Sequence, residues 1–245
     1  MPQTFTATDS MYGDHAHLYD PMYAWKDYEA EAEALRAVLV SEGVAEGSRL
    51  LEAAVGTGGH LRHLARHFEV AGFDLNAGMI AVARTKLPSC RLWVADMRAF
   101  EVEAPVDALL CLFSSIGYLT DQAQLEQAAA RFHAALRPGG LLVIEPWVTP
   151  EQWRDGHPSL QTYDSPDLKL ARGTVGRREG DLSVMDMHWL VVRPGQPVEH
   201  FVDQHRVWLC PRDQMRQIFE AAGFDLRFED PGLPRGRGLF IGRRR

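Results

Sequence analysis

Three acidic residues follow successive apolar runs in a pattern that suits a nucleoside ligand. Glu52 lies in the first run, directly before the glycine-rich segment 56–59 (GTGG), Asp74 closes the second run, and Asp96 follows the third. Glycines let a backbone approach a ligand closely, and a carboxylate one strand away can accept hydrogen bonds from two ribose hydroxyls. The spacing therefore predicts a nucleoside-binding edge of a sheet.

The kind of nucleoside follows from where the acids lie. An acid at Glu52 would repel a pyrophosphate, but it can accept from the amino group of a methionine moiety. Asp96 can accept from an adenine amine while the thioether of Met97 packs on the ring. Together with a ribose contact at Asp74, these features predict S-adenosyl-L-methionine as cofactor and S-adenosyl-L-homocysteine as its product. The alternatives are a nicotinamide dehydrogenase and, for each acid alone, a simple helix cap.

Strands and helices alternate in the segments around these acids. Strands are expected at residues 50–54, 70–73, 92–95, 108–113 and 141–144, with helices between them and another at 27–41. A helix at 211–222 and two strands, 224–228 and 238–242, close the chain. This order predicts the α/β class: a doubly wound, mostly parallel, seven-stranded Rossmann-like sheet.

The pattern changes between residues 151 and 210. Strand-like segments 169–175, 182–192 and 198–209 are separated by turn signals, which predicts an antiparallel insertion of about three strands. We therefore expect three parts. Residues 1–26 form a tail and lid segment, 27–150 with 211–245 form the cofactor-binding core, and 151–210 form the wall of the acceptor pocket.

Composition excludes several classes of partner. The net charge of −7 argues against bulk attraction to nucleic acid or anionic membranes. The three cysteines have neither paired spacing nor nearby histidines, so no disulfide framework and no metal site is expected. The sequence shows no apolar run of the ~20 residues that span a bilayer and no signal peptide pattern. We expect a cytoplasmic protein acting on a small molecule, with a homodimer as the expected assembly.

Several segments of the chain resemble one known family. They are LLEAAVGTGGHL, GFDLNAGMIAVAR, ADMRAF, CLFSSIGYL, LRPGGLLVIEPW and GRGLFIG, within residues 19–242. Together they are similar to bacterial N,N-dimethyltransferases that act on nucleotide-linked 3-amino-3,6-dideoxy sugars, as in desosamine and mycaminose formation. The resemblance implies methyl transfer to the amine of a dTDP-3-amino-3,6-dideoxyhexose in antibiotic biosynthesis. The chain departs from the family pattern at Val148, Thr149 and Arg235.

The resemblance and the strand ends together assign the candidate site residues. The expected cofactor-binding residues are Tyr28, Glu52, Ala54, Gly56, Gly58, Asp74, Leu75, Asp96, Met97 and Leu112. The expected catalytic residues are Tyr19, Tyr118 and Ser115, and the expected substrate-binding residues are Tyr23, Glu145, Trp147 and Arg237.

The expected reaction is a direct SN2 displacement by a neutral amine, which alignment alone accelerates strongly. The site must also keep the amine unprotonated, a task for a tyrosine, a carboxylate or a histidine. Tyr118 is a candidate for accepting the proton or orienting the amine, and the planar fork of Arg237 suits a diphosphate. Three histidines in the insertion, His188, His200 and His205, are expected to be structural or exposed.

Two other functions stay open on the sequence. The departures at residues 148, 149 and 235, with the tryptophans, allow an N-methyltransferase acting on a flat heterocycle such as an azapteridine toxin precursor. The tryptophans concerned are Trp25, Trp147, Trp153, Trp189 and Trp208. The other function is a module that binds S-adenosylmethionine without transferring its methyl group.

Overall fold

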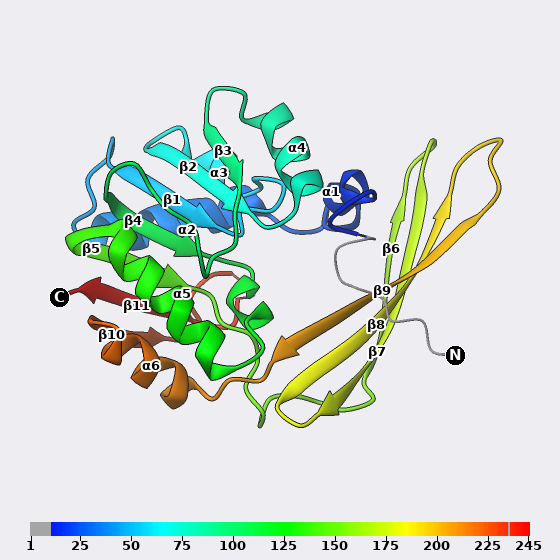
Figure 1. Cartoon of the computed structure of the whole chain (residues 1–245). Helices are drawn as coiled ribbons and strands as arrows, with labels where there is room; N and C mark the ends of the chain where they lie inside the picture. The colour runs from blue at the N-terminus through cyan, green and yellow to red at the C-terminus, as the bar shows by residue number, and fades with distance from the viewer. Residues whose placement is uncertain (1–10, 235) are drawn as a thin grey trace.

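The computed structural model of the chain describes residues 11–234 and 236–245, and its framework is two sheets (Figure 1). The larger sheet has seven strands in the order β10-β11-β5-β4-β1-β2-β3. They are β1 (Arg49–Ala53), β2 (Glu69–Asp74), β3 (Arg91–Val94), β4 (Val106–Cys111), β5 (Leu136–Ile144), β10 (Phe224–Glu229) and β11 (Leu239–Arg244). Strands β1 to β5 run parallel, whereas β11 is antiparallel to both of its neighbours. The predicted α/β class and mostly parallel seven-stranded sheet are confirmed.

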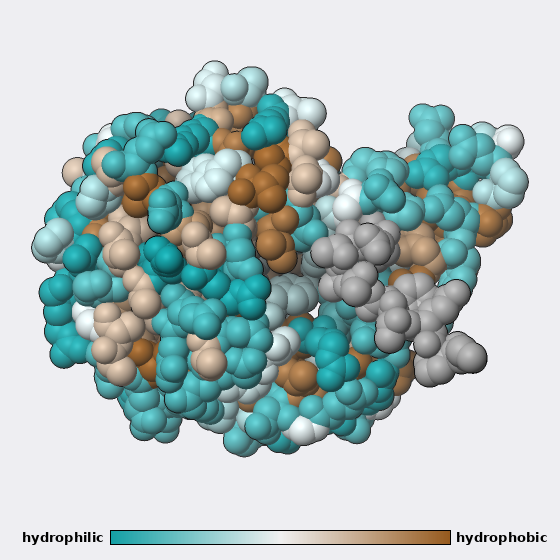
Figure 2. Space-filling model, viewed as in Figure 1, coloured by the Kyte–Doolittle hydropathy of each residue, from teal (hydrophilic) through white to brown (hydrophobic). Residues whose placement is uncertain are grey.

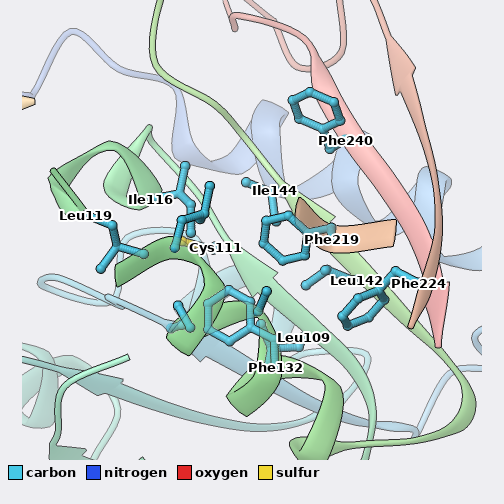
Figure 3. Packing of buried hydrophobic residues seen from close by; sticks show 14 of the residues in the cluster. Leu109, Cys111, Ile116, Leu119, Phe132, Leu142, Ile144, Phe219, Phe224 and Phe240 are labelled. Atoms are coloured by element: carbon cyan, nitrogen blue, oxygen red, sulfur yellow. The ribbon is translucent and has the colours of Figure 1, made fainter. Parts of the chain in front are cut away.

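Helices cover both faces of the larger sheet because its central strands are apolar on both sides. One face packs on α2 (Tyr28–Ser41), α3 (Leu61–Leu64) and α4 (Ala77–Lys86), and the other on α5 (Gln122–Ala135) and α6 (Arg212–Ala221). The buried residues on the α2, α3 and α4 face form a first cluster, and those on the α5 and α6 face form a second. Along β4, Leu109 and Cys111 belong to the second cluster, whereas Ala108 and Leu110 belong to the first. Figure 3 shows Phe132 and Phe219 packed beside Leu109 and Leu142 in the second cluster.

Local chemistry fixes where the two longest helices begin. The Asp27 carboxylate accepts a hydrogen bond from the Ala30 amide at 2.9 Å and caps α2. Asp121 accepts from the Gln124 amide at 2.9 Å and caps α5. The last predicted parallel strand begins earlier than expected, since β5 already pairs with β4 at Leu136, ahead of the glycines.

The smaller sheet is the antiparallel insertion. Its strands are β6 (Pro158–Asp164), β7 (Lys169–Glu179), β8 (Leu182–Val192) and β9 (Glu199–Trp208), in that order. The expectation of about three strands was wrong, because β6 also belongs to the sheet. Strand β6 lies at the edge with mostly exposed side chains, so it carries no alternation of apolar and polar residues.

The N-terminal segment joins the two sheets. Its short helices are η1 (Ala16–Leu18) and α1 (Tyr19–Met22), and the 3-10 helix η2 (Ser115–Tyr118) follows β4. Leu18 and Met22 are buried in a third cluster with Trp189 and Val191 of β8. Residues 1–10 of the predicted tail and lid segment lie outside the described residues. Within the described part of the chain, none of the helices combines the length and the apolar character required to cross a bilayer.

Candidate active site

A cavity of about 680 Å³ lies where the parallel strands end, between the larger sheet, the N-terminal segment and the smaller sheet. Figure 2 shows a depression with apolar side chains beside it at this junction. Glu52, Asp74 and Asp96, from the ends of three neighbouring strands, all line this cavity. Every predicted site residue lines it except Gly58 and Glu145. The structure therefore brings the candidate site together in a single volume.

The glycine-rich segment after β1 shapes one wall. Ala54 has a φ of 54° and Gly56 a φ of 56°, so the chain turns through the left-handed region directly after the strand. A Cβ atom on Gly59 would lie 2.5 Å from the ring of Tyr28, and this ring lines the cavity. Gly58 instead faces α4, where a Cβ atom would lie 2.9 Å from the Leu87 side chain. Gly58 thus supports the loop from behind.

Glu52 presents an unpartnered oxygen at the cavity. The residue is 2% exposed, and its Oε2 atom has no hydrogen-bond partner. Burial raises the pKa of the Glu52 carboxyl, although the His60 ring, with Nδ1 3.6 Å from Oε1, opposes that rise. A buried carboxylate oxygen without a donor is costly unless a ligand supplies one. The ammonium group of a methionine moiety fits this requirement.

His60 connects Glu52 to a second carboxylate. Its Nε2 atom lies 2.8 Å from Oε2 of Glu31, and the Lys26 ammonium donates to the same carboxylate at 2.5 Å. Burial alone would lower the pKa of His60, but Glu31 and Glu52 outweigh it, and the pKa is raised. The His60 side chain is buried, at 3% exposure. A histidine held between two acids was not detectable without the position of α2.

Cofactor affinity is expected to depend on pH through Glu52. The ammonium of the ligand prefers ionised Glu52, so affinity is full above the Glu52 pKa and falls below it; this pKa lies above the ordinary 4.5. His60 lowers the Glu52 pKa, so in His60→Asn the pKa rises further and affinity is lost at higher pH. Calorimetric titration with S-adenosylhomocysteine from about pH 8 to about pH 5 measures this shift. His67→Asn, at a partly exposed ring paired with Glu46, is the matched control. Coinciding wild-type and His60→Asn curves would contradict the prediction.

Backbone amides orient the Asp74 carboxylate. Its Oδ2 accepts from the Gly56 amide and its Oδ1 from the Asn76 amide, both at 2.9 Å. Burial still raises the pKa of Asp74, and these hydrogen bonds only moderate that rise. A carboxylate has about four lone-pair directions, so both oxygens can also accept from hydroxyl groups. This geometry fits a ribose diol.

Asp96 is held differently. The Arg98 guanidinium donates to both Asp96 oxygens, at 3.0 Å and 2.5 Å, and its hydrogen bonds lower the pKa of the Asp96 carboxyl. Asp96 therefore stays ionised, with its direction fixed by its neighbour. Met97 lies beside it on the cavity wall, where a thioether can pack on a flat ring.

The tip of β4 is strained where it meets the cavity. Phe113 and Ser114 have φ values of 51° and 63°, a region that residues with side chains rarely adopt. The Glu145 carboxylate accepts from the Phe113 amide at 2.8 Å, and the Ser114 hydroxyl donates to the Pro146 carbonyl at 2.7 Å. Glu145 was expected to bind substrate, but it does not line the cavity. Its carboxylate holds this loop in place.

Arg172 of β7 and Arg237 in the segment before β11 line the cavity from elements other than the strand ends that carry the three acids, and we call these two parts of its wall the basic half and the acidic half. The Arg237 guanidinium lies 4.5 Å from the centre of the Trp147 ring and donates to the Ser114 hydroxyl at 3.2 Å; desolvation lowers its pKa. Arg172 of β7 is 8% exposed and donates to the Tyr23 hydroxyl at 2.8 Å, while its Nε atom has no partner. No pattern in the sequence marks Arg172, because its position depends on how the smaller sheet packs. Basic groups thus face the acids across one volume.

Tyrosines line the region between these halves. Tyr19 and Tyr23 have ring centres 4.5 Å apart, and the Tyr12 hydroxyl lies 2.7 Å from that of Tyr118. Burial raises the pKa of Tyr12, Tyr19 and Tyr118. These phenols therefore stay neutral and act as hydrogen-bonding groups. The sequence gives no signal at Tyr12, because this residue lies in a segment without a regular pattern of apolar and polar residues.

Asp20 fastens the N-terminal segment over the cavity. Its carboxylate accepts from the Thr57 hydroxyl at 2.6 Å and from the Lys86 ammonium at 2.7 Å, and so joins α1 to the glycine loop and to α4. These contacts close one side of the cavity. They also make the segment part of the site.

Replacing Asp20 by alanine is expected to weaken cofactor binding about fivefold, because a partly exposed ion pair and one hydrogen bond contribute only about 1 kcal/mol. Faster dissociation of S-adenosylhomocysteine, followed by stopped-flow fluorescence, measures the loss. Asp14→Ala, at an exposed position of the same segment, is the control. An unchanged dissociation rate in Asp20→Ala would show that the contacts do not close the site.

Known proteins with related sequences and folds identify the class. A family model described as a methyltransferase domain matches residues 50–140. A dTDP-3-amino-3,6-dideoxy-alpha-D-glucopyranose N,N-dimethyltransferase from Streptomyces fradiae is 40% identical over 94% of this chain and 91% of its own length. The crystal structure of Streptomyces venezuelae DesVI superimposes with a TM-score of 0.89 at 38% identity, covering 95% of this chain and 99% of DesVI.

The S-adenosylmethionine-bound structure of CalS10, an amino pentose methyltransferase from Micromonospora echinaspora, has a TM-score of 0.83 at 30% identity, covering 100% of this chain and 99% of CalS10. The fold and the site define an S-adenosylmethionine-dependent methyltransferase. Within that class, the chain belongs to the family of amino-sugar N,N-dimethyltransferases. The predicted cofactor and enzyme class are confirmed.

Proposed function

We propose that this enzyme dimethylates the amine of a dTDP-3-amino-3,6-dideoxyhexose in antibiotic biosynthesis. The observation that carries the proposal is the division of the cavity into an acidic half, with Glu52, Asp74 and Asp96, and a basic half, with Arg172 and Arg237. The acidic half suits the cationic amino acid, ribose and adenine of the cofactor. The basic half suits an anionic acceptor, which a nucleotide-linked sugar is and a neutral heterocycle is not.

Arg237 is the expected diphosphate ligand. A guanidinium carries five N–H donors in a planar fork, more than the Ser114 hydroxyl can use, so Arg237 can also donate to phosphate oxygens. Its burial beside Trp147 removes competing water and strengthens that interaction. The Trp147 Nε1 atom donates to the Ser183 hydroxyl at 3.0 Å, and this hydrogen bond fixes the ring in a position where it can pack against the acceptor.

The remaining residues align the amine. When bound, S-adenosylmethionine supplies an electrophilic methyl group. Tyr19, Tyr118 and Ser115 line the cavity between its two halves, where they can direct the amine lone pair toward that methyl group. The N-terminal segment, fastened by Asp20, excludes water from this region.

Incubation with a defined acceptor tests the proposal. We expect dTDP-3-amino-3,6-dideoxyglucose to be converted first to the monomethyl and then to the dimethyl product, detected by mass spectrometry with formation of S-adenosylhomocysteine. Free thymidine diphosphate should compete with the acceptor. Turnover of a heterocyclic amine without such competition would replace the proposal, and binding of S-adenosylmethionine without turnover of any amine would indicate a binding module.

Most of the described residues that favoured a heterocyclic acceptor do not line the cavity. Val148 and Thr149 do not line it, and Arg235 lies outside the described residues. Of the five tryptophans considered, Trp25 and Trp147 line the cavity, whereas Trp153, Trp189 and Trp208 do not. The cavity wall therefore favours the nucleotide sugar.

The expected homodimer finds support on the smaller sheet. Leu160, Val175, Leu190 and Val192 share the face of that sheet turned away from Arg172 and Thr174, and each is more than a third exposed. An exposed apolar face of this kind suits contact with a second copy. Light scattering of the purified enzyme should give twice the chain mass; a monomer would oppose it.

A further inference from the structure

An unbroken chain of hydrogen bonds runs from the cavity into the smaller sheet. The Tyr118 hydroxyl lies 2.5 Å from Nδ1 of His205, and Nε2 of His205 lies 2.8 Å from Oδ2 of Asp203. Tyr118 lines the cavity, whereas His205 and Asp203 are 4% and 3% exposed. An imidazole between a hydroxyl and a buried carboxylate is the arrangement that lets histidine accept a proton from the hydroxyl.

The geometry fixes the direction of the chain. The Asp203 carboxylate accepts a hydrogen bond, so Nε2 of His205 carries the hydrogen and Nδ1 is left as an acceptor for the Tyr118 hydroxyl. The other titratable and charged groups around Tyr118 are Tyr12, Tyr19, Tyr23 and Arg172, and Tyr12 can accept or donate at 2.7 Å. None of these groups is a carboxylate that could compete with Asp203 for the hydrogen on Nε2 of His205.

Dimethylation creates the need for such a chain. After the first methyl transfer the acceptor nitrogen is a secondary ammonium, which has no lone pair for a second displacement. The nitrogen must therefore lose a proton before it can attack the methyl group of a second cofactor molecule. Burial raises the pKa of Tyr118, so this phenol does not hold a lasting negative charge and can only pass a proton onward.

We propose that Asp203, His205 and Tyr118 form a proton outlet, a hydrogen-bonded relay that removes a proton from the acceptor amine before each methyl transfer. The inference rests on the proposed function. The ammonium N–H gives its proton to the Tyr118 oxygen while the Tyr118 hydroxyl gives its own proton to Nδ1 of His205. The nitrogen keeps the electron pair of its broken N–H bond, and the positive charge moves to His205 beside the Asp203 carboxylate. The proton returns to water through Tyr118 each time the spent cofactor is exchanged, so His205 is neutral again before the next transfer. His205 and Asp203 act through Tyr118 and are positioning residues.

His205→Asn is the main test. Asparagine places an amide near the position of Nδ1, so it can still accept from Tyr118, but it has no basic nitrogen. At neutral pH, where an alkyl amine is mostly protonated, we expect turnover to fall about 100-fold with the acceptor KM within twofold, and the monomethyl product to accumulate. As the pH rises toward the range where the free amine is neutral, the ratio of wild-type to variant turnover should shrink toward one.

Two results would overturn the proposal. A loss of activity that is the same at every pH would indicate a structural role for His205, and wild-type activity with normal dimethyl product would remove any role. Asp203→Asn serves as a second variant if His205→Asn does not fold, and the same loss with the same pH rescue is expected. Glu199→Gln, at a partly exposed carboxylate of the same strand, should leave the profile unchanged.

A measurement without turnover separates this proposal from the proposed function. In enzyme labelled with ¹⁵N-histidine and saturated with S-adenosylhomocysteine, His205 should carry hydrogen on Nε2 alone. Addition of the dimethylated dTDP-sugar as its ammonium should protonate Nδ1. No change at Nδ1 overturns the outlet. If the wild-type enzyme fails to methylate this sugar at all, the proposed function fails instead, and the pH profile is recorded with the amine that it does methylate.

Discussion

Replacing Arg237 by methionine is expected to lower kcat/KM for the dTDP-amino sugar about 100-fold. A half-buried guanidinium bonded to a phosphate contributes about 3 kcal/mol, and methionine keeps the bulk beside Trp147 without the charge. Most of the loss should be an increased KM, because the diphosphate is remote from the reacting nitrogen. Steady-state kinetics with the sugar nucleotide as the varied substrate measures it.

Two variants make this prediction specific. Arg237→Lys keeps the charge but loses the planar fork, and should lose about tenfold. Arg212→Met removes an arginine that packs over Phe228, 4.1 Å from the ring centre and outside the cavity wall, and should change nothing. Affinity for S-adenosylhomocysteine should stay within twofold in all three. An unchanged KM in Arg237→Met would place the diphosphate elsewhere.

Replacing Asp74 by alanine is expected to weaken S-adenosylhomocysteine binding about 100-fold, because two hydrogen bonds from the ribose hydroxyls to a carboxylate are lost. The fold itself should not suffer. Burial raises the pKa of Asp74, so ionised Asp74 destabilises the folded state at neutral pH, and its removal should leave Tm unchanged or higher. Calorimetric titration and thermal denaturation of the same sample separate the two effects.

Glu69 provides the matched control for Asp74. It begins β2, the strand that Asp74 ends, and it is exposed. Glu69→Ala should leave both affinity and Tm close to wild type. Equal losses of affinity in the two variants would show that the strand, and not the carboxylate at its end, is responsible.

The sequence predicted the larger sheet because its strands carry their own signal. Residues 108–111 are apolar without interruption, and the structure buries this part of β4 under helices on both faces. The acids at the strand ends could be placed for the same reason, since neighbouring parallel strands end at one edge of a sheet. For these strands and acids, the pattern of apolar residues in the sequence agrees with the position in the structure.

The acceptor side of the cavity could not be predicted in this way. Arg172 and His205 belong to strands whose neighbours in the sequence say nothing about the cavity. Arg172 lines it where β7 meets Tyr23 of the N-terminal segment, and His205 is connected to it only through the Tyr118 hydroxyl. Glu145 shows the opposite failure. Its place at a strand end suggested a substrate contact, but the strained backbone at Phe113 needs an acceptor for its amide and uses that carboxylate.

A crystal structure of the enzyme with S-adenosylhomocysteine tests the central claim most directly. We expect Glu52 within hydrogen-bond distance of the ligand ammonium, Asp74 on both ribose hydroxyls, and Asp96 on the adenine amine. The Oε2 atom of Glu52, unpartnered here, should gain its donor. A ligand that occupies the basic half beside Arg237, or that leaves the three carboxylates without contact, would contradict this account.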